Sequence, residues 1–484
     1  MTDTSLLETI ISYPWILSIV ILFVISATLT IYRTFSHPLA PIPGPFLAKF
    51  SSAWLHYHTY KGDECSTIRR LHALYGPVIR IAPNEIDIAD GKAIAEIYHT
   101  KASDILKAAH YRKFDVDGHA TIFSTIESEH RLVRFKAVAS LFATASINES
   151  RHVIKECASK FVSRLRADAS CSREVDILNL ARSFACDVTT ACLFRDRYGA
   201  LDETRVPVSA FVDSFVTIGR FFYLPSGFSV VMDWLSMVVF PDKMAKSSVQ
   251  AVDSYLGRLV GYDVKKGGYP ARLMEAGISV DEAKAQSKDL VFAGTYSTGM
   301  TIATLCWLLA RNPEKYAILR RESLQHQSTG ANVNSPPYLR ATIKEGMRLS
   351  MASPTRLTRT VSGSGMNFRG HHLPAGTNVG LGAFQLHLNP DVFPDPEQFL
   401  PERWEQATPE MQRDWVPFGM GSRACIARGL ATTSVFEAMQ QIIAADVLNG
   451  AQPVKNKIEI KEWYNSKVID GQISLTWPKE GKLI

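Results

Sequence analysis

The sequence predicts a predominantly α-helical protein with a minor β portion, an α+β fold, preceded by one N-terminal transmembrane helix. Residues 127–318 carry apolar faces at helical spacing and few turn-forming pairs. The longest helical run among them, residues 279–310, stops at the helix terminator Asn312-Pro313. Residues 10–32 are uncharged and mostly apolar, and β-type alternation is confined to short stretches.

The N-terminal segment is long enough to cross a membrane. Residues 10–32 are 23 consecutive uncharged residues, which reach roughly 35 Å against a bilayer core of about 30 Å. A cleaved signal peptide is the alternative, but the leader carries two acidic residues and no Lys or Arg. Positive charge follows the segment at Arg33, Lys49 and Lys61, which predicts a cytoplasmic C-terminal body. We assign residues 1–33 to a single-pass membrane anchor.

The chain after the anchor divides into a hinge and one large domain. The sequence PLAPIPGP at residues 38–45 predicts a stiff, extended spacer, so residues 34–50 are assigned to a Pro-rich hinge. Residues 51–484 contain no Gly/Ser-rich or charge-rich linker and no internal repeat. They are therefore expected to form a single domain, although length alone favours about three.

Short elements complete this domain. Residues 78–88 alternate apolar and polar side chains around a Pro-Asn turn, which predicts two short strands. Residues 338–349 and 427–445 have helical composition. Short apolar runs punctuated by Gly and Thr predict a small sheet over residues 368–381, and residues 472–477 resemble a further strand.

Composition narrows the class of protein. With 46% hydrophobic and 21% charged residues, the 484-residue chain can bury a large core and is too apolar for disorder. The net charge of +6 is modest and no basic–aromatic interleaving is present, so nucleic acid is not an expected partner. Seven cysteines without paired spacing argue against a disulfide framework and fit a reducing compartment.

The most informative motif surrounds Cys425. Residues 418–427 (FGMGSRACIA) place this cysteine in a Gly-punctuated loop that leads into a helix. Backbone N–H groups and the helix dipole there are expected to lower the thiol pKa and stabilise an anionic sulfur ligand. An inert buried thiol is the alternative. Three upstream motifs favour the ligand: AG at 293–294, EGMR at 345–348 and PERW at 401–404.

In this order the four motifs resemble the cytochrome P450 superfamily, specifically its membrane-bound eukaryotic, fungal-type members. The resemblance covers the chain from Pro38 to the C-terminus. It implies the cytochrome P450 fold, a haem-thiolate catalytic domain over residues 51–484, and haem b with Cys425 as the axial iron ligand. Phe418 is expected to shield the sulfur, and Arg423 to pair with a haem propionate.

The resemblance implies further propionate partners. His130 and Arg134 match the helical W/H-x-x-x-R element of the family, and Arg359 falls where another propionate-binding Arg is expected. For each of these residues, a solvated basic face is the alternative.

Three charged residues resemble the buried charge triad of the family. Glu345 and Arg348 are one helical turn apart, and Arg403 lies in the PERW motif. One carboxylate between two guanidinium groups can satisfy the desolvated charges, so the triad is expected to hold the thiolate loop without touching substrate.

The distal helix departs from the family pattern A-G-x-[Asp/Glu]-Thr, because residues 293–298 read AGTYST. Gly294 is expected to leave room at the haem for dioxygen. Ser297 retains a hydroxyl that can donate a hydrogen bond to dioxygen, with Thr298 beside it. Tyr296 replaces the acid, and a phenol with a pKa of about 10 is a poor proton shuttle near neutrality. Alternatively, Tyr296 only packs while water delivers the proton.

Two segments are expected to cover the pocket by the same resemblance. Aromatic residues cluster over 211–240, and residues 102–125 contain Phe114, Ile122 and Phe123. Ordinary core packing is the alternative for about half of these aromatic residues.

The leading functional hypothesis is a monooxygenase that inserts one atom of dioxygen into an apolar specialised metabolite, such as a terpenoid or polyketide. Because no Rossmann or flavin fingerprint is present, electrons are expected from NADPH through a separate NADPH–cytochrome P450 reductase, with cytochrome b5 as an additional donor. The expected location is the endoplasmic reticulum membrane, with the catalytic domain in the cytosol.

Two other classes stay open on the sequence. Tyr296 motivates an isomerase, dehydratase, cyclase or desaturase of the same fold that inserts no oxygen. A non-catalytic haem or ligand carrier is the third reading. Dependence on NADPH separates the monooxygenase from the isomerase, and turnover separates it from the carrier.

Overall fold

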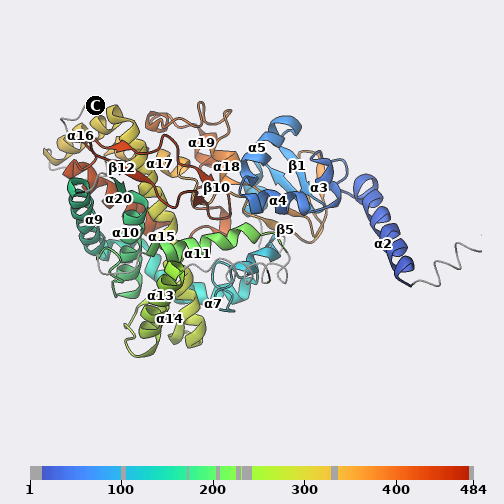
Figure 1. Cartoon of the computed structure of the whole chain (residues 1–484), viewed down its shortest axis with the longest axis horizontal. Coiled ribbons are helices and arrows are strands. Elements are labelled where there is room, and N and C mark those ends of the chain that lie inside the picture. The colour runs from blue at the N-terminus through green and yellow to red at the C-terminus, as the bar shows by residue number, and fades with distance from the viewer. Residues whose placement is uncertain are drawn as a thin grey trace, which may run out of the picture.

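A long helix, α15 (Val280–Arg311), runs through the helical part of the protein (Figure 1). The Ser279 side chain accepts a hydrogen bond from the Glu282 N–H and caps its first turn. Asn312 and Pro313 end it, as predicted from the sequence. The structure is a computed structural model, and it describes residues 14–99, 105–171, 174–202, 208–224, 231, 243–328 and 336–478.

The other helices pack around α15 or cover the sheets. Those in contact with α15 are α10 (Ile177–Phe194), α11 (Val208–Ile218), α13 (Lys243–Gly261), α14 (Tyr269–Glu275), α16 (Pro313–Ser328), α17 (Pro337–Leu349) and α20 (Arg428–Ala445). The remaining α-helices of the domain are α3 (Phe46–Phe50), α4 (Ala53–Lys61), α5 (Glu64–Tyr75), α6 (Ala93–Tyr98), α7 (Ser128–Val138), α8 (Thr144–Glu149), α9 (Arg151–Cys171), α18 (Ala383–His387) and α19 (Pro409–Asp414).

Within the described residues, short strands form four small sheets. The largest has the order β1-β2-β8-β5-β3, in which β2 and β8 are parallel and the other neighbours are antiparallel. A second sheet has the order β4-β12-β9, and β6-β7 and β10-β11 are two-stranded. The strands are β1 (Val78–Ala82), β2 (Glu85–Ile88), β3 (Ile105–Lys107), β4 (Val175–Asp176), β5 (Arg359–Val361), β6 (Met366–Phe368), β7 (His371–Leu373), β8 (Asn378–Gly380), β9 (Gln452–Pro453), β10 (Ile460–Lys461), β11 (Lys467–Val468) and β12 (Ser474–Thr476).

These elements confirm the predicted fold class. Strands are present within residues 78–88 and 472–477, as predicted. Strands also form within residues 368–381, and the predicted helix that ends at Ala445 is present. The main apolar core lies among α9, α10, α15, α17 and α20, and a smaller one packs on the five-stranded sheet. The helical core and the sheet region therefore lie side by side (Figure 1).

The N-terminal helix α2 (Pro14–Ile31) projects away from the rest of the protein (Figure 1). Residues Trp15–Ser36 have a mean hydropathy of 2.3 with no part of the span buried, which fits a membrane anchor. The span Ile177–Phe194 is also long and apolar enough to cross a membrane. It is 83% buried, so it is the core helix α10.

The prediction of a stiff, extended spacer over residues 38–45 was wrong. The chain makes successive turns there, with hydrogen bonds from the Ala40 N–H to the His37 carbonyl and from the Ile42 N–H to the Leu39 carbonyl. Leu39 and Ile42 are buried in the smaller core. Two apolar side chains in a Pro-rich segment can gain more from burial than from extension.

Candidate active site

One internal cavity, of about 340 Å³, brings the predicted distal and proximal motifs together. Gly294 and Ser297 of α15 line it, as do Phe418 and Cys425 of the loop before α20. These residues are far apart in sequence, and the packing of α15 against α20 brings them to one space.

The loop that carries Cys425 is shaped by two glycines. Gly419 and Gly421 have φ angles of 70° and 67°, in the left-handed region that glycine tolerates. A Cβ on Gly421 would overlap the Tyr98 carbonyl oxygen. The Cys425 N–H donates to the Phe418 carbonyl oxygen over 2.8 Å, which closes the loop just before α20 begins.

The Cys425 thiol has exposed surface although protein surrounds it, because that surface faces the cavity. Burial raises the thiol pKa above its ordinary value, and the Ala427 N–H and the Arg428 charge act in the opposite direction. The expectation that the helix N-terminus alone lowers this pKa was therefore wrong: desolvation is the larger effect. A bound metal cation is what keeps a coordinating thiol deprotonated.

The distal helix presents hydroxyl groups to the cavity. Ser297 and Thr298 both line it. The Ser297 hydroxyl donates to the Ala293 carbonyl oxygen over 3.0 Å. Gly294 also lines the cavity, but a Cβ there would overlap Thr189 of α10. The glycine therefore permits the close approach of α15 and α10, which is a different reason from the one the sequence indicated.

Tyr296 is among the residues that line the cavity, but its hydroxyl is engaged by backbone carbonyl oxygens and is not available as the missing acid would be. Its side chain is 1% exposed, and its hydroxyl lies 2.7 Å from the Ala352 carbonyl oxygen and 2.6 Å from that of Ser466. Burial raises the phenol pKa above its ordinary value. The alternative that Tyr296 packs structurally agrees with this geometry.

Four cations gather at one end of the cavity. Lys107, Arg131 and Arg423 line it, and Lys107, Arg359 and Arg423 also line a small adjoining cavity of about 30 Å³. Among the described residues, no carboxylate forms an ion pair with any of the four. Burial, with repulsion from Arg131 and Arg359, lowers the pKa of Arg423 to about 10. Asp289 acts electrostatically on Lys107 and Glu127 on Arg423, but neither carboxylate forms an ion pair with these four side chains, so positive charge predominates in the cluster.

Their other contacts hold these cations in place. The Arg423 guanidinium donates to the carbonyl oxygens of Thr125 and Ile126 over 3.1 and 3.0 Å. The Arg359 guanidinium lies 5.0 Å from the centroid of the Tyr98 ring. Lys107 lies over two aromatic rings and donates to the Phe123 carbonyl oxygen.

The structure does not bring His130 and Arg134 to the cavity wall. Arg134 donates to both carboxylate oxygens of Glu282, and His130 Nε2 lies 3.7 Å from the same carboxylate. The buried His130 Nδ1 has no partner among the described residues, so its role as a propionate partner stays a prediction. Arg131, between the two in sequence, lines the cavity instead.

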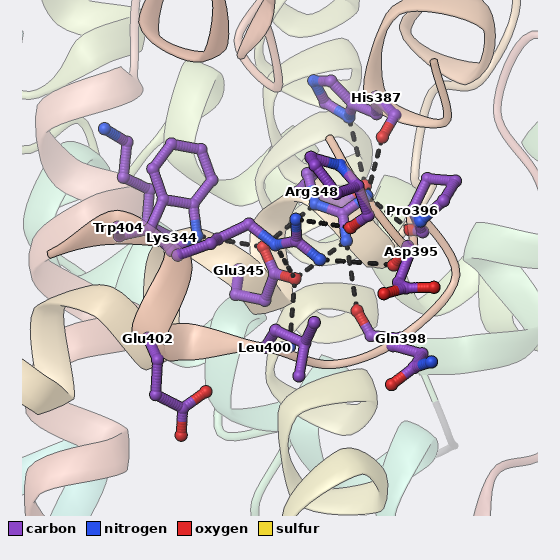
Figure 2. Close-up of polar contacts among 12 residues, drawn as sticks. Lys344, Glu345, Arg348, His387, Asp395, Pro396, Gln398, Leu400, Glu402 and Trp404 are labelled. Carbon is purple, nitrogen blue, oxygen red and sulfur yellow. Dashed lines mark hydrogen bonds and ion pairs between the residues drawn. The ribbon is translucent and has the colours of Figure 1, made fainter. Parts of the chain in front are cut away.

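Figure 2 shows the network of polar contacts around Glu345 and Arg348. Arg348 donates to both Glu345 oxygens over 2.9 and 2.8 Å, and both side chains are fully buried. Arg403 donates to Glu345 over 3.1 Å, and the Trp404 indole donates over 2.9 Å. The predicted triad is therefore present, and the indole adds a fourth member. None of these side chains lines the cavity.

The cavity wall is largely aromatic and aliphatic. Phe114, Ile122, Phe123 and Phe215 all line it, so the three candidate contacts predicted in residues 102–125 are all part of the wall. Phe211 is buried in the core instead, and Phe228, Trp234 and Phe240 lie outside the described residues.

A haem fits the donor set of this cavity. A single cysteine sulfur opens into it, and at one end stands a cation cluster without a carboxylate partner. A buried cluster of uncompensated positive charge is costly, and the two propionates of a haem supply the missing anions. Cys425 would then be the iron ligand, with Arg131, Arg359, Arg423 and Lys107 at the propionates.

Comparison with known proteins decides the family. The Cytochrome P450 family profile matches residues 42–260 and 269–445 of this chain. The chain belongs to the cytochrome P450 family. The family implies a haem-thiolate iron cofactor for this P450.

Curated relatives of this P450 are fungal enzymes. It is 35% identical over 481 residues to the cytochrome P450 monooxygenase mfmF of Annulohypoxylon moriforme, which covers 92% of this chain and 96% of the relative. It is 27% identical to the monooxygenase BOT1 of Botryotinia fuckeliana, over 84% of each chain. It is 28% identical to the N-acetyltryptophan 6-hydroxylase ivoC of Emericella nidulans, over 89% of this chain and 90% of the relative. The protein is therefore a haem monooxygenase of the fungal type, an oxidoreductase.

Lys107, Arg131 and Asp289 are among the cavity residues that sequence reasoning missed. Arg131 directly follows His130, which the family motif had identified. Only the orientation of helix α7 decides which of the two side chains faces the cavity. Lys107 lies in no motif. Asp289 had a readable signal, because it is an acid one turn before Ala293 in a helix expected to face the pocket.

Proposed function

We propose that this P450 is a membrane-anchored enzyme that inserts one atom of dioxygen into an apolar specialised metabolite. One observation carries the proposal: Cys425 and the hydroxyl-bearing turn of α15 at Ser297 line the same largely apolar cavity. When bound, the haem supplies the activation of dioxygen at its iron. Electrons would come from NADPH through NADPH–cytochrome P450 reductase, with cytochrome b5 as an additional donor.

The residues of the chain have separate roles in holding the haem, limiting access of water and supporting the site. Cys425 holds the iron, and the cation cluster orients the haem through its propionates. Phe418, which also lines the cavity, limits access of water to the sulfur. The triad of Glu345, Arg348 and Arg403 holds the segment after Pro394 in place without contacting substrate.

Proton handling on the distal side falls to hydroxyl groups. Ser297 and Thr298 line the cavity, and the Ser297 hydroxyl is only held by a carbonyl of its own helix. It can rotate to donate to a ligand and be re-protonated from water. Tyr296 takes no part, because its hydroxyl lies among the Ala352 and Ser466 oxygens.

The cavity wall supports an apolar or aromatic substrate. Phe114, Phe123 and Phe215 present ring surfaces, and Ile122 and Leu290 present aliphatic ones. Burial of apolar surface is the main source of affinity in such a pocket. The relative from Emericella nidulans is named for an aromatic amide, and an aromatic substrate would be compatible with this wall.

Location and partners follow from the surface. The exposed helix α2 supports a single-pass anchor in the endoplasmic reticulum membrane with the catalytic domain in the cytosol. Lys136 and Arg428 are exposed near the thiolate side. Positive charge there would steer an acidic electron-donor protein to the haem.

The isomerase alternative loses its main support. It was motivated by Tyr296 in place of the distal acid, yet the hydroxyl of this cavity-lining residue is hydrogen-bonded to backbone carbonyl oxygens, while Ser297 keeps its place in the cavity wall. The alternative remains an outcome of the decisive experiment.

That experiment is turnover with heavy-isotope dioxygen in a host that supplies a reductase and candidate precursors. The ferrous carbon-monoxide spectrum serves as the control for an intact thiolate–haem. A product carrying one labelled oxygen atom supports the proposal. An unlabelled product that forms without NADPH would establish an isomerase or dehydratase, and an unlabelled product that requires NADPH would establish a desaturase.

A further inference from the structure

Three segments of the backbone meet at the hydroxyl of Tyr296. The hydroxyl lies 2.6 Å from the Ser466 carbonyl oxygen, 3.0 Å from the Ser466 Oγ and 2.7 Å from the Ala352 carbonyl oxygen. The Ser466 N–H also donates to the Ala352 carbonyl oxygen over 3.0 Å. Helix α15, the segment after α17 and the C-terminal loop are thus joined at one point.

The hydrogens in this junction can be assigned from simple counting. A phenol has one hydrogen to donate and can accept one. The single Tyr296 hydrogen is shared between the Ser466 and Ala352 carbonyl oxygens, and the Tyr296 oxygen accepts from the Ser466 hydroxyl. The Ser466 N–H also donates to the Ala352 carbonyl oxygen. Every one of these groups is then satisfied in a site where Ser466 and Tyr296 are each 1% exposed.

Both loops held by this junction form walls of the active-site cavity. Met351 and Ser353 flank Ala352, and all three line the cavity. Tyr464 and Asn465, directly before Ser466, line it as well. A displacement at the junction would therefore move two walls at once.

The ring of Tyr296 is fixed in place from the other side. It stacks on Phe292, with ring centroids 5.9 Å apart and an interplanar angle of 18°, and Phe292 stacks on Phe215 at 5.1 Å. Because Phe215 lines the cavity, the stack links the junction to a third part of the wall.

We propose that Tyr296 is a positioning residue that sets the substrate-side walls of the cavity through Ala352 and Ser466, and so determines which substrates and substrate positions the enzyme accepts. This proposal rests on the proposed monooxygenase function only in treating the bound molecule as a substrate. The junction forms the cavity walls whatever reaction the enzyme catalyses.

The chemistry of the junction explains why an acid is unsuitable here. Tyr296 faces two carbonyl oxygens, which only accept hydrogen bonds. A carboxylate in its place would set acceptor against acceptor in a desolvated site, which is unfavourable. A chain that closes its pocket in this way therefore needs a donor of phenol length at residue 296.

The test compares Tyr296→Phe with the matched control Tyr255→Phe. The Tyr255 hydroxyl also donates to a backbone carbonyl, that of Asp196 over 2.6 Å, and Tyr255 is 6% exposed but does not line the cavity. Each substitution removes one buried hydroxyl and keeps the ring. The ferrous carbon-monoxide spectrum establishes that both variants hold a thiolate-ligated haem.

Two iron-binding azoles of different size serve as probes, read by the shift of the haem absorption band. Imidazole reaches the iron without touching the walls, whereas clotrimazole fills the cavity. We expect Tyr296→Phe to weaken clotrimazole about three- to tenfold, the effect of one lost hydrogen bond, and to change imidazole less than twofold. Hydrogen exchange at the Ser466 amide should speed up in Tyr296→Phe and stay unchanged in Tyr255→Phe.

Several outcomes would overturn the proposal. These are equal weakening of both azoles, equal effects of the two variants, or unchanged clotrimazole affinity and Ser466 exchange. Unchanged affinities together with a loss of product per NADPH would instead make Tyr296 a proton donor. Because azole binding and amide exchange need no turnover, failure of the monooxygenase proposal would leave these readouts intact.

Discussion

Arg134 holds Glu282 with two hydrogen bonds, from Nε over 2.5 Å and from Nη2 over 2.8 Å, and so ties α7 to the first turn of α15. The charge of Arg134 is thereby compensated within the protein. Arg131, on the same helix, faces the cavity and has no such carboxylate. The two arginines, three residues apart, therefore have different roles: Arg134 binds a carboxylate within the protein and Arg131 faces the cavity.

The first prediction separates these roles. Arg131→Ala should release haem several-fold faster to apomyoglobin, because a propionate partner is lost. Arg134→Ala should leave haem release within about twofold and lower the free energy of unfolding by about 1.5–3 kcal/mol, as expected for a charged hydrogen bond. The reverse pattern would restore Arg134 as the propionate partner that the family motif indicates.

The second prediction concerns the buried triad. Arg348→Ala leaves Glu345 buried without its bidentate partner, so we expect a loss of about 3–5 kcal/mol in unfolding free energy and a weak ferrous carbon-monoxide spectrum. The control is Arg369→Ala, since Arg369 also binds a carboxylate, Asp90, but is 48% exposed in its side chain. That change should cost less than about 1 kcal/mol. Similar losses in guanidinium chloride titrations of the two variants would show that burial does not set the effect.

The third prediction concerns the thiolate loop. Gly421→Ala forces a side chain into a left-handed backbone and against the Tyr98 carbonyl. The variant should show a reduced share of thiolate-ligated haem in the ferrous carbon-monoxide spectrum. Gly370→Ala is the control, because its φ is 78° but open space surrounds it. It should cost about 1 kcal/mol in stability and keep the spectrum intact. A normal spectrum in Gly421→Ala would mean that the loop shifts freely.

The fourth prediction concerns Asp289, which lines the cavity. Burial raises its carboxyl pKa to about 6, and the Thr121 hydroxyl and the Lys107 charge oppose the rise. The folded state therefore holds a proton that the unfolded chain, with a pKa of about 3.9, has already lost. Stability from this proton is complete below about pH 4 and is lost as pH rises through about 6.

The measurement is thermal unfolding of the holoenzyme and of Asp289→Asn between pH 4.5 and 7.5. The stability of the wild type relative to the variant should fall as pH rises to about 6 and then level off. Parallel pH profiles would indicate that Asp289 titrates near the ordinary pKa of Asp.

Patterns local in sequence were reliable guides to the fold. The helix α15 follows its predicted bounds, because its apolar periodicity, the Ser279 cap and the Asn312-Pro313 stop act within a few residues. The strands on both sides of the Pro83-Asn84 turn also appear where predicted. The prediction of an extended chain in the Pro-rich segment was wrong. Leu39 and Ile42 are buried in a core formed by residues distant in the sequence, which no local pattern indicates.

The candidate site divides in the same way. Cys425, Ser297 and the triad were readable, because each belongs to a motif with fixed spacing. The orientation of α7 was not readable, so the motif pointed to Arg134 where the structure presents Arg131 to the cavity. The pKa of Cys425 was assigned the wrong direction, because the helix terminus is local while desolvation is set by everything that surrounds the sulfur.

By itself, the sequence determined the fold class, the membrane-spanning length of the N-terminal segment and the cysteine proposed to bind iron. Each rests on composition, periodicity or a short motif. Only the tertiary structure decided what Tyr296 does. Its partners, Ala352 and Ser466, are 56 and 170 residues further along the chain, and no local pattern records which distant carbonyl oxygens converge on a hydroxyl. A residue read as a missing proton donor is, in the folded chain, the hydrogen-bond donor that joins two walls of the cavity.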